Sequence, residues 1–107
     1  MKGGEDVKGR YSRVISAWYI LMQYQITRAW VEMLNNPADV ELWGGWCQRV
    51  EDAISSLPAR DSEILQYVVS DARPVDIADA WDCSILQARS CASVALALFY
   101  REFMARA

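Results

Sequence analysis

The stretch ILQARS, from Ile85 to Ser90, contains side chains that can recognise nucleic acid. Gln87 and Arg89 carry the amide and guanidinium groups that hydrogen-bond to adenine and guanine edges, and Ile85 can contact a thymine methyl group. Leu86, next to Ile85, gives the same stretch an apolar tip, which suits a groove on another protein at least as well. The residue types therefore leave two kinds of partner open, DNA and protein.

Two short helices joined by a tight corner are expected to position this stretch. Ala78 is the small residue that is needed where one helix crosses another. Asp82 tolerates the left-handed backbone conformation of a sharp turn, and Ser84 can cap the helix that follows. Apolar contacts between the two helices are expected from Ile77, Trp81, Cys83, Ala88 and Cys91.

The rest of the chain also has helical patterning, and no strand-like alternation appears. The fold class is therefore all-α, a compact domain of about five helices over residues 11–107. Residues 1–10 are polar and contain glycine, so we expect them to form a flexible lead-in. The expected helices run over Tyr11–Leu34, from Pro37 to Leu57 with an interruption at Leu42–Cys47, over Asp61–Val69 and Val75–Trp81, and from Ile85 to about Met104.

Apolar residues at gaps of three and four mark one face of the first helix, and the simplest interpretation is that this face belongs to the core. Tyr19 and Trp30 widen it, so part of the surface can instead bury against a partner. The face consists of Ile15, Trp18, Met22, Ile26, Ala29 and Met33.

Four further features bear on the packing. Asn36 can cap the second helix and Pro37 suits its first position. Gly44 and Gly45 are expected either to bend that helix or to let another backbone approach closely. The segment CASVALALFYREF is apolar on nearly all faces, so it must be covered all round, either as a central core helix or at an interface with a second copy or another protein. A second core face is predicted from Trp46, Val50, Ala53, Ile54 and Leu57.

LPARDSEILQYVV followed by PVDIADAWDCSILQARS resembles sigma-factor region four, over about Leu57 to Ser93. Similar helix-turn-helix segments occur in small phage transcription regulators, including Q-type antiterminators, which act on promoter DNA and RNA polymerase. The upstream WGGW resembles, loosely, a tryptophan pair of those proteins. The positions that match the family pattern are Leu57, Pro58, Glu63, Ile64, Leu65, Asp76, Ile77, Ala78 and Ser84.

The resemblance implies a helix-turn-helix at about residues 75–100 whose second helix faces the major groove. Its DNA-binding residues would be Ser84, Ile85, Gln87, Arg89 and Ser90. The chain departs from the family in having Gln87 and Ala88 where Thr-Val is usual, and Arg89 is the only basic residue between Ser84 and Tyr100. If the partner is a protein, the interface candidates are Leu86, Trp43 and Trp46.

Charge counts against strong non-specific DNA binding. The chain has a net charge of −3, and from Leu57 to the end it has five basic and seven acidic residues. A protein that neutralises many phosphates is usually basic. Clamping of the DNA backbone by this segment alone would therefore be weak.

Other classes of function are disfavoured. The chain has no histidine and no glycine-rich phosphate loop, so we expect neither an enzyme nor a bound cofactor. Its cysteines, Cys47, Cys83 and Cys91, are odd in number and lack a CxxC pair, which favours reduced thiols in the cytoplasm of a bacterial cell over a zinc site or disulfides. The early apolar run from Val14 to Met22 is too short to span a membrane.

Two hypotheses remain. The favoured one is a phage or bacterial transcription regulator, antiterminator-like, that engages promoter DNA, RNA polymerase or both. The alternative is a small acidic inhibitor or adaptor that binds a protein and keeps the helix-turn-helix shell without binding DNA. The sequence also leaves a homodimer open.

Overall fold

A computed structural model describes residues 2–106, with side-chain surroundings from residue 12 onward. It contains five helices and no strand within the described range, so the all-α prediction is confirmed. The bounds of the helices are α1 Lys2–Val31, α2 Pro37–Ser55, α3 Ala59–Val69, α4 Pro74–Trp81 and α5 Ile85–Ala105.

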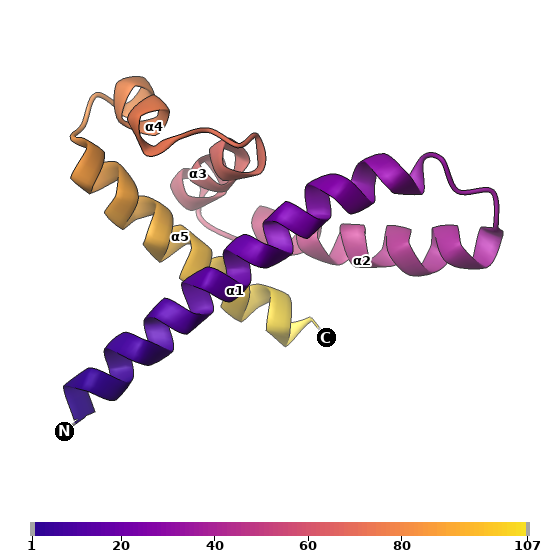
Figure 1. The fold of residues 1–107 in the computed structure, drawn as a ribbon, viewed down its shortest axis with the longest axis horizontal. Coiled ribbons are helices and arrows are strands. Elements are labelled where there is room, and N and C mark those ends of the chain that lie inside the picture. The colour runs from indigo at the N-terminus through magenta and orange to yellow at the C-terminus, as the bar shows by residue number, and fades with distance from the viewer. Residues whose placement is uncertain (1, 107) are drawn as a thin grey trace.

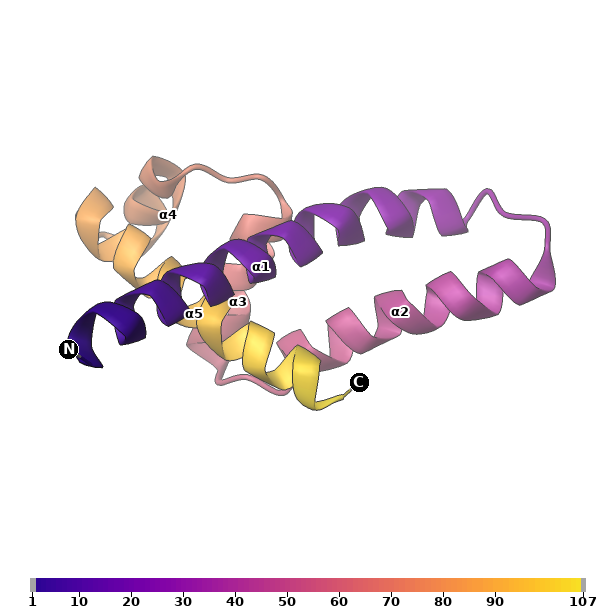
Figure 2. The same ribbon diagram turned by 60° about the horizontal axis from the view of Figure 1, so that its bottom comes forward.

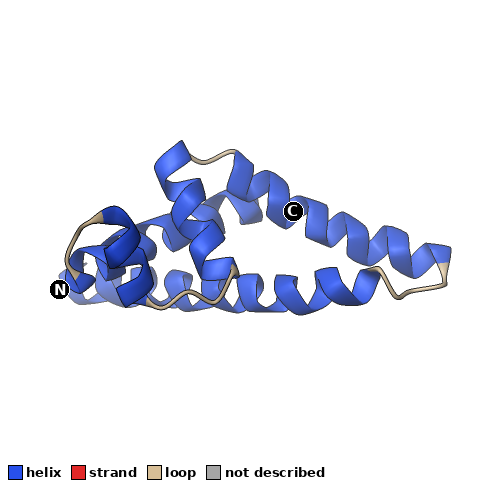
Figure 3. Cartoon of the chain, turned by 90° about the horizontal axis from the view of Figure 1, so that it is seen from above, coloured by secondary structure: helices blue, strands red, loops and turns tan. Residues whose placement is uncertain are grey.

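The C-terminal helix α5 is the centre of the structure, because it packs against each of the other four helices. Figure 1 shows α1 crossing α5, with α3 and α4 along one end of α5. Figure 2 shows the C-terminal half of α1 running beside α2, with a turn joining the two helices at the end away from α4. Seen from above in Figure 3, the connections between the helices are short. The prediction of a central core helix in this segment is therefore confirmed.

One main core lies around the middle of α5. Phe99 and Ala95 are fully buried, and Phe103 stacks on Phe99 with ring centroids 5.7 Å apart. The predicted second core face is confirmed, because Val50, Ala53, Ile54 and Leu57 are buried and Trp46 packs against them. The other buried members of this core are Ala17, Leu21, Ile64, Leu65 and Leu96.

The predicted core face of α1 is wrong. Ala17 and Leu21 are fully buried instead, with Val14, Ile20 and Tyr24 packed beside them. These residues share the face that turns toward α5, whereas the predicted stripe lies on the opposite side of the helix. Its exposed members include Ile15 (46%), Trp18 (47%), Ile26 (64%) and Met33 (76%), and the flanking residues Tyr19 and Trp30 are exposed as well.

The predicted helix starts and stops hold to within a few residues, with two exceptions. α1 begins at Lys2, so the segment expected to be a flexible lead-in is helical from that residue on. α2 continues through Gly44 and Gly45, and an added Cβ at either glycine would meet nothing within 4 Å. No backbone therefore approaches these glycines, and they do not interrupt the helix. The Asn36 side chain caps α2 as predicted, accepting a hydrogen bond from the Ala38 amide at 2.9 Å.

Candidate functional site

The residues that the sequence singles out meet at the corner between α4 and α5, where the two helices are bent by 103° relative to each other. Asp82 has φ 50° and ψ 51°, the left-handed conformation that was predicted for the turn. The Cys83 amide donates to the Ala78 carbonyl oxygen at 3.0 Å and closes the end of α4. Figure 1 shows this corner at the end of α5 that lies away from the C-terminus.

Small residues let the two helices pack closely at the corner. Ile77, Ala78 and Ala88 form a buried cluster of their own, in which Ala78 is 5% and Ala88 1% exposed. Tyr67, Trp81 and Cys83 pack around this cluster. The predicted contacts of Ala78, Ala88, Ile77, Trp81 and Cys83 are confirmed, whereas Cys91 packs against the main core.

The start of α5 is fixed by reciprocal hydrogen bonds between Ser84 and Gln87. The Gln87 backbone amide donates to the Ser84 hydroxyl oxygen at 3.0 Å, and the Ser84 backbone amide donates to Gln87 Oε1 at 3.0 Å. This is a capping box, which satisfies two amides that the helix leaves unpaired. It also occupies the side-chain oxygen with which Gln87 would accept a hydrogen bond from an adenine edge. The Gln87 side chain therefore caps the helix through its oxygen, and its remaining free group is the side-chain nitrogen Nε2.

The outer surface of the corner is apolar at its tip and has one unpaired cation. Leu86 is 77% and Ile85 49% exposed. Arg89 and Ser90 are exposed one turn further along α5. Arg89 makes no hydrogen bond or ion pair with any described residue, so its guanidinium group is free to meet a partner.

Acidic side chains are also exposed at this corner. Asp79 and Asp82 are exposed on α4 and at the turn. Arg73, at the start of α4, is paired with Asp76 at 3.4 Å, and Arg60 of α3 lies over the Trp81 ring at 5.1 Å. The surface around the corner therefore has no cluster of free basic residues among the described side chains.

The two tryptophans proposed as protein contacts have different surroundings. Trp46 packs edge-on against Phe103, with ring centroids 6.3 Å apart, and belongs to the rim of the main core. Trp43 lies toward the turn that joins α1 and α2, edge-on to Trp30 at 6.2 Å, and is 37% exposed. Both tryptophans pack against residues away from the α4–α5 corner, so WGGW does not extend that site.

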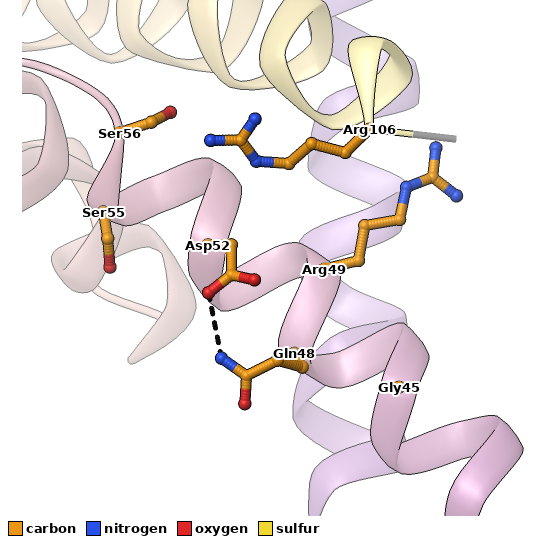
Figure 4. Close-up of a pocket in the computed structure, with 7 residues that line it drawn as sticks. All are labelled: Gly45, Gln48, Arg49, Asp52, Ser55, Ser56 and Arg106. Carbon is orange, nitrogen blue, oxygen red and sulfur yellow. Dashed lines mark hydrogen bonds between the residues drawn. The ribbon is translucent and has the colours of Figure 1, made fainter.

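A polar surface depression lies between α2 and the end of α5 (Figure 4). It contains Arg49, which the sequence did not single out. It is lined by Gly45, Gln48, Arg49, Asp52, Ser55, Ser56 and Arg106. Arg49 donates from Nη2 to the Phe103 carbonyl oxygen at 2.7 Å, and Arg106 pairs with Glu102 at 3.6 Å. Both cations are engaged within the protein, so the described depression offers no free cation, and its carboxylate, Asp52, accepts a hydrogen bond from Gln48 Nε2 at 2.9 Å.

The groups with raised pKa values are not arranged as nucleophiles. Burial raises the pKa of the Cys47 thiol. Burial, followed by a 3.1 Å hydrogen bond to Glu51, raises the pKa of the Tyr24 hydroxyl. Each group is thereby held in its protonated form near neutral pH. All three cysteines are free thiols.

No single helix of residues 2–106 is long and apolar enough to cross a membrane. α4 and α5 pass that test of length and composition only when taken together, as a pair bent by 103°.

Comparison of the chain with models of known families, with curated proteins and with solved structures found no match.

Proposed function

We propose that the α4–α5 corner is a helix-turn-helix and that the protein is a transcription regulator, antiterminator-like, which engages promoter DNA together with RNA polymerase. The observation that carries the proposal is the corner itself. Its 103° bend and three-residue turn agree with the geometry of DNA-binding helix-turn-helix units, in which the second helix enters the major groove. The left-handed Asp82 and the Ser84 cap fix that second helix at its first turn.

Arg89 is the residue expected to contact DNA. It is exposed, unpaired and one turn into α5, where side chains of a recognition helix reach base edges or phosphates. Ser84 and Ser90 can add hydroxyl contacts. Because Gln87 is tied into the capping box, we assign it a structural part in presenting this surface.

DNA contact of this kind is weak without help, because the described side chains of the corner offer one free cation and two exposed carboxylates, Asp79 and Asp82. The exposed apolar tip of Ile85 and Leu86 supplies a second kind of contact, which we assign to a protein of the transcription apparatus. In this arrangement Leu86 holds the protein partner, and Arg89 contacts the DNA beside it.

The test is the affinity for duplex DNA, measured by fluorescence anisotropy as a function of salt. Affinity should fall as salt rises, and Arg89→Ala should reduce the salt slope by roughly one. Arg101→Ala is the matched control, because Arg101 is an exposed cation on the same helix but far from the corner. Equal slopes for wild type and Arg89→Ala would contradict contact between Arg89 and DNA.

A second candidate is an adaptor or inhibitor that binds a protein and does not bind DNA. The observation that favours it is the 77% exposure of Leu86 at a corner where Asp79 and Asp82 are also exposed, because carboxylates repel phosphates. Binding of purified bacterial RNA polymerase would then be lost in Leu86→Asp and kept in Arg89→Ala. Absence of DNA binding even at low salt, combined with that pattern, would replace the first proposal by the second.

A further inference from the structure

The outer face of α1 is an apolar strip that the described chain covers only at its edges, where Trp30 meets Trp43 and Trp18 borders a depression lined by α3, α4 and α5. Five α1 side chains and one residue of the following turn contribute large exposed surfaces, and none of them is charged. They are Ile15, Trp18, Tyr19, Ile26, Trp30 and Met33, with exposures of 46 to 76%. We call this set the outer strip.

The outer strip has the spacing of a helix that packs against one other helix. Its members Ile15, Tyr19, Ile26 and Met33 follow one another at gaps of four, seven and seven, and the apolar residues Met22 and Ala29 divide the two longer gaps into steps of three and four. This alternation keeps apolar side chains in one line and suits packing at a crossing angle of about 20°. Among the described helices, only α1 leaves such a line exposed.

α1 buries the smaller of its two apolar faces. Ala17 and Leu21 turn toward α5 and are fully buried, while both tryptophans of the helix remain about half exposed. Aromatic residues and methionine are enriched at the centres of protein interfaces, and charged residues are depleted there. The composition of the outer strip therefore matches an interface better than an ordinary solvated surface.

We infer that the outer strip pairs with the outer strip of a second copy, so that the protein is a homodimer through α1. An uncharged strip with a regular spacing is self-complementary, as a two-fold symmetric interface requires. Aromatic side chains bury about 150–250 Å² each and the aliphatic ones somewhat less, so six that are about half exposed or more offer on the order of 600 Å² before polar margins are counted. A stable interface needs about 800 Å² per partner, which the strip approaches with its margins.

The polar margins are compatible with this pairing. Between Arg13 and Arg28 the helix has no charged residue, and the polar positions there are Ser16, Gln23, Gln25 and Thr27. Two copies of the strip therefore meet without like charges facing each other along this length. The proposal concerns α1 alone and does not depend on what the α4–α5 corner binds.

The test is the mass of the full chain by sedimentation equilibrium across a range of concentrations, with Ile26→Glu as the disrupting variant. Ile26 lies in the middle of the strip and is 64% exposed, so the variant should fold as a monomer with unchanged helix content by circular dichroism. The wild type should sediment as two chains at micromolar concentration. The wild-type dimer should dissociate only at concentrations at least tenfold lower than those at which the Ile26→Glu variant dissociates.

Val94→Glu is the matched control. Val94 is 52% exposed on α5, outside the strip, and the substitution introduces the same charge. This variant should remain dimeric. A wild type that is monomeric at all concentrations would overturn the proposal, and so would an Ile26→Glu variant that dimerises as tightly as Val94→Glu.

Discussion

The guanidinium group of Arg49 lies 3.7 Å from the centroid of the Phe103 ring and donates to the carbonyl oxygen of the same residue, at 3.0 Å from Nε and 2.7 Å from Nη2. A side chain of α2 thus adds hydrogen bonds to a carbonyl in the last turn of α5, which also accepts from the Arg106 amide at 3.3 Å. Phe103 is itself buried and stacks on Phe99. Arg49 therefore ties α2 to the end of the central helix.

Arg49→Met should lower the free energy of unfolding by about 1–3 kcal/mol, because it removes charge-assisted hydrogen bonds and a cation–π contact while keeping an apolar stem. Urea unfolding followed by tryptophan fluorescence measures this loss. Arg106→Met is the control, because Arg106 only forms a surface ion pair with Glu102 and should cost less than about 0.5 kcal/mol. Equal losses in the two variants would show that the Phe103 contact does not stabilise the fold.

Gly44→Ala and Gly45→Ala should each raise the free energy of unfolding by about 0.5–1 kcal/mol. Both glycines lie within α2 without a positive φ, and an added Cβ meets no atom within 4 Å. Alanine lowers the entropy of the unfolded chain and is the better helix former. The same urea titration checks this, and a decrease for either variant would mean that something outside the single chain packs against that glycine.

The features that depend on a few consecutive residues could be predicted from the sequence. Asn36 and Ser84 cap helices because their short polar side chains reach the next turn, and Asp82 turns the chain because it tolerates the left-handed region. These rules need no knowledge of the rest of the fold. The corner could be described from the sequence for that reason.

The choice between two apolar faces of α1 could not be made in this way. Apolar residues recur at helical spacing on both faces, and the prediction considered only the face with the larger side chains. The crossing of α1 and α5 instead buries Ala17 and Ala95, which are both fully inaccessible in the main core. Small residues let two helices approach closely, and that requirement appears only when the helices are placed together. The Arg49–Phe103 contact, 54 residues apart in the chain, escaped prediction for the same reason.

Ala78→Leu should destabilise the protein by about 1–3 kcal/mol, because Ala78 lies in the small buried cluster with Ile77 and Ala88 and has no room for three more carbon atoms. Ala80→Leu is the control on the same helix, where the side chain is exposed. Thermal unfolding measures both. If Ala78→Leu unfolds at the same temperature as Ala80→Leu, α4 and α5 do not pack through this cluster.

The stability of the start of α4 should depend on pH through the carboxyl group of Asp76. The Arg73 backbone amide donates to Asp76 Oδ2 at 2.9 Å. This hydrogen bond, followed by the Arg73 side chain, holds the pKa of the Asp76 carboxyl below its ordinary value of 3.8. Because the folded state binds the proton less readily than the unfolded state, the contribution of Asp76 to stability is fully present above pH 3.8. It is lost as the pH falls through the lower value of the folded protein.

Asp76→Asn should therefore be less stable than the wild type at neutral pH, and the difference should shrink as the pH falls below 3.8. Asparagine can still accept the Arg73 amide, so the variant isolates the effect of the charge. Urea unfolding at a series of pH values from neutral to strongly acidic measures the difference. Asp79→Asn is the control for net charge, because Asp79 of the same helix accepts no hydrogen bond from a described residue. A difference between wild type and Asp76→Asn that stays constant over the whole series would show that the carboxylate charge does not stabilise this helix start.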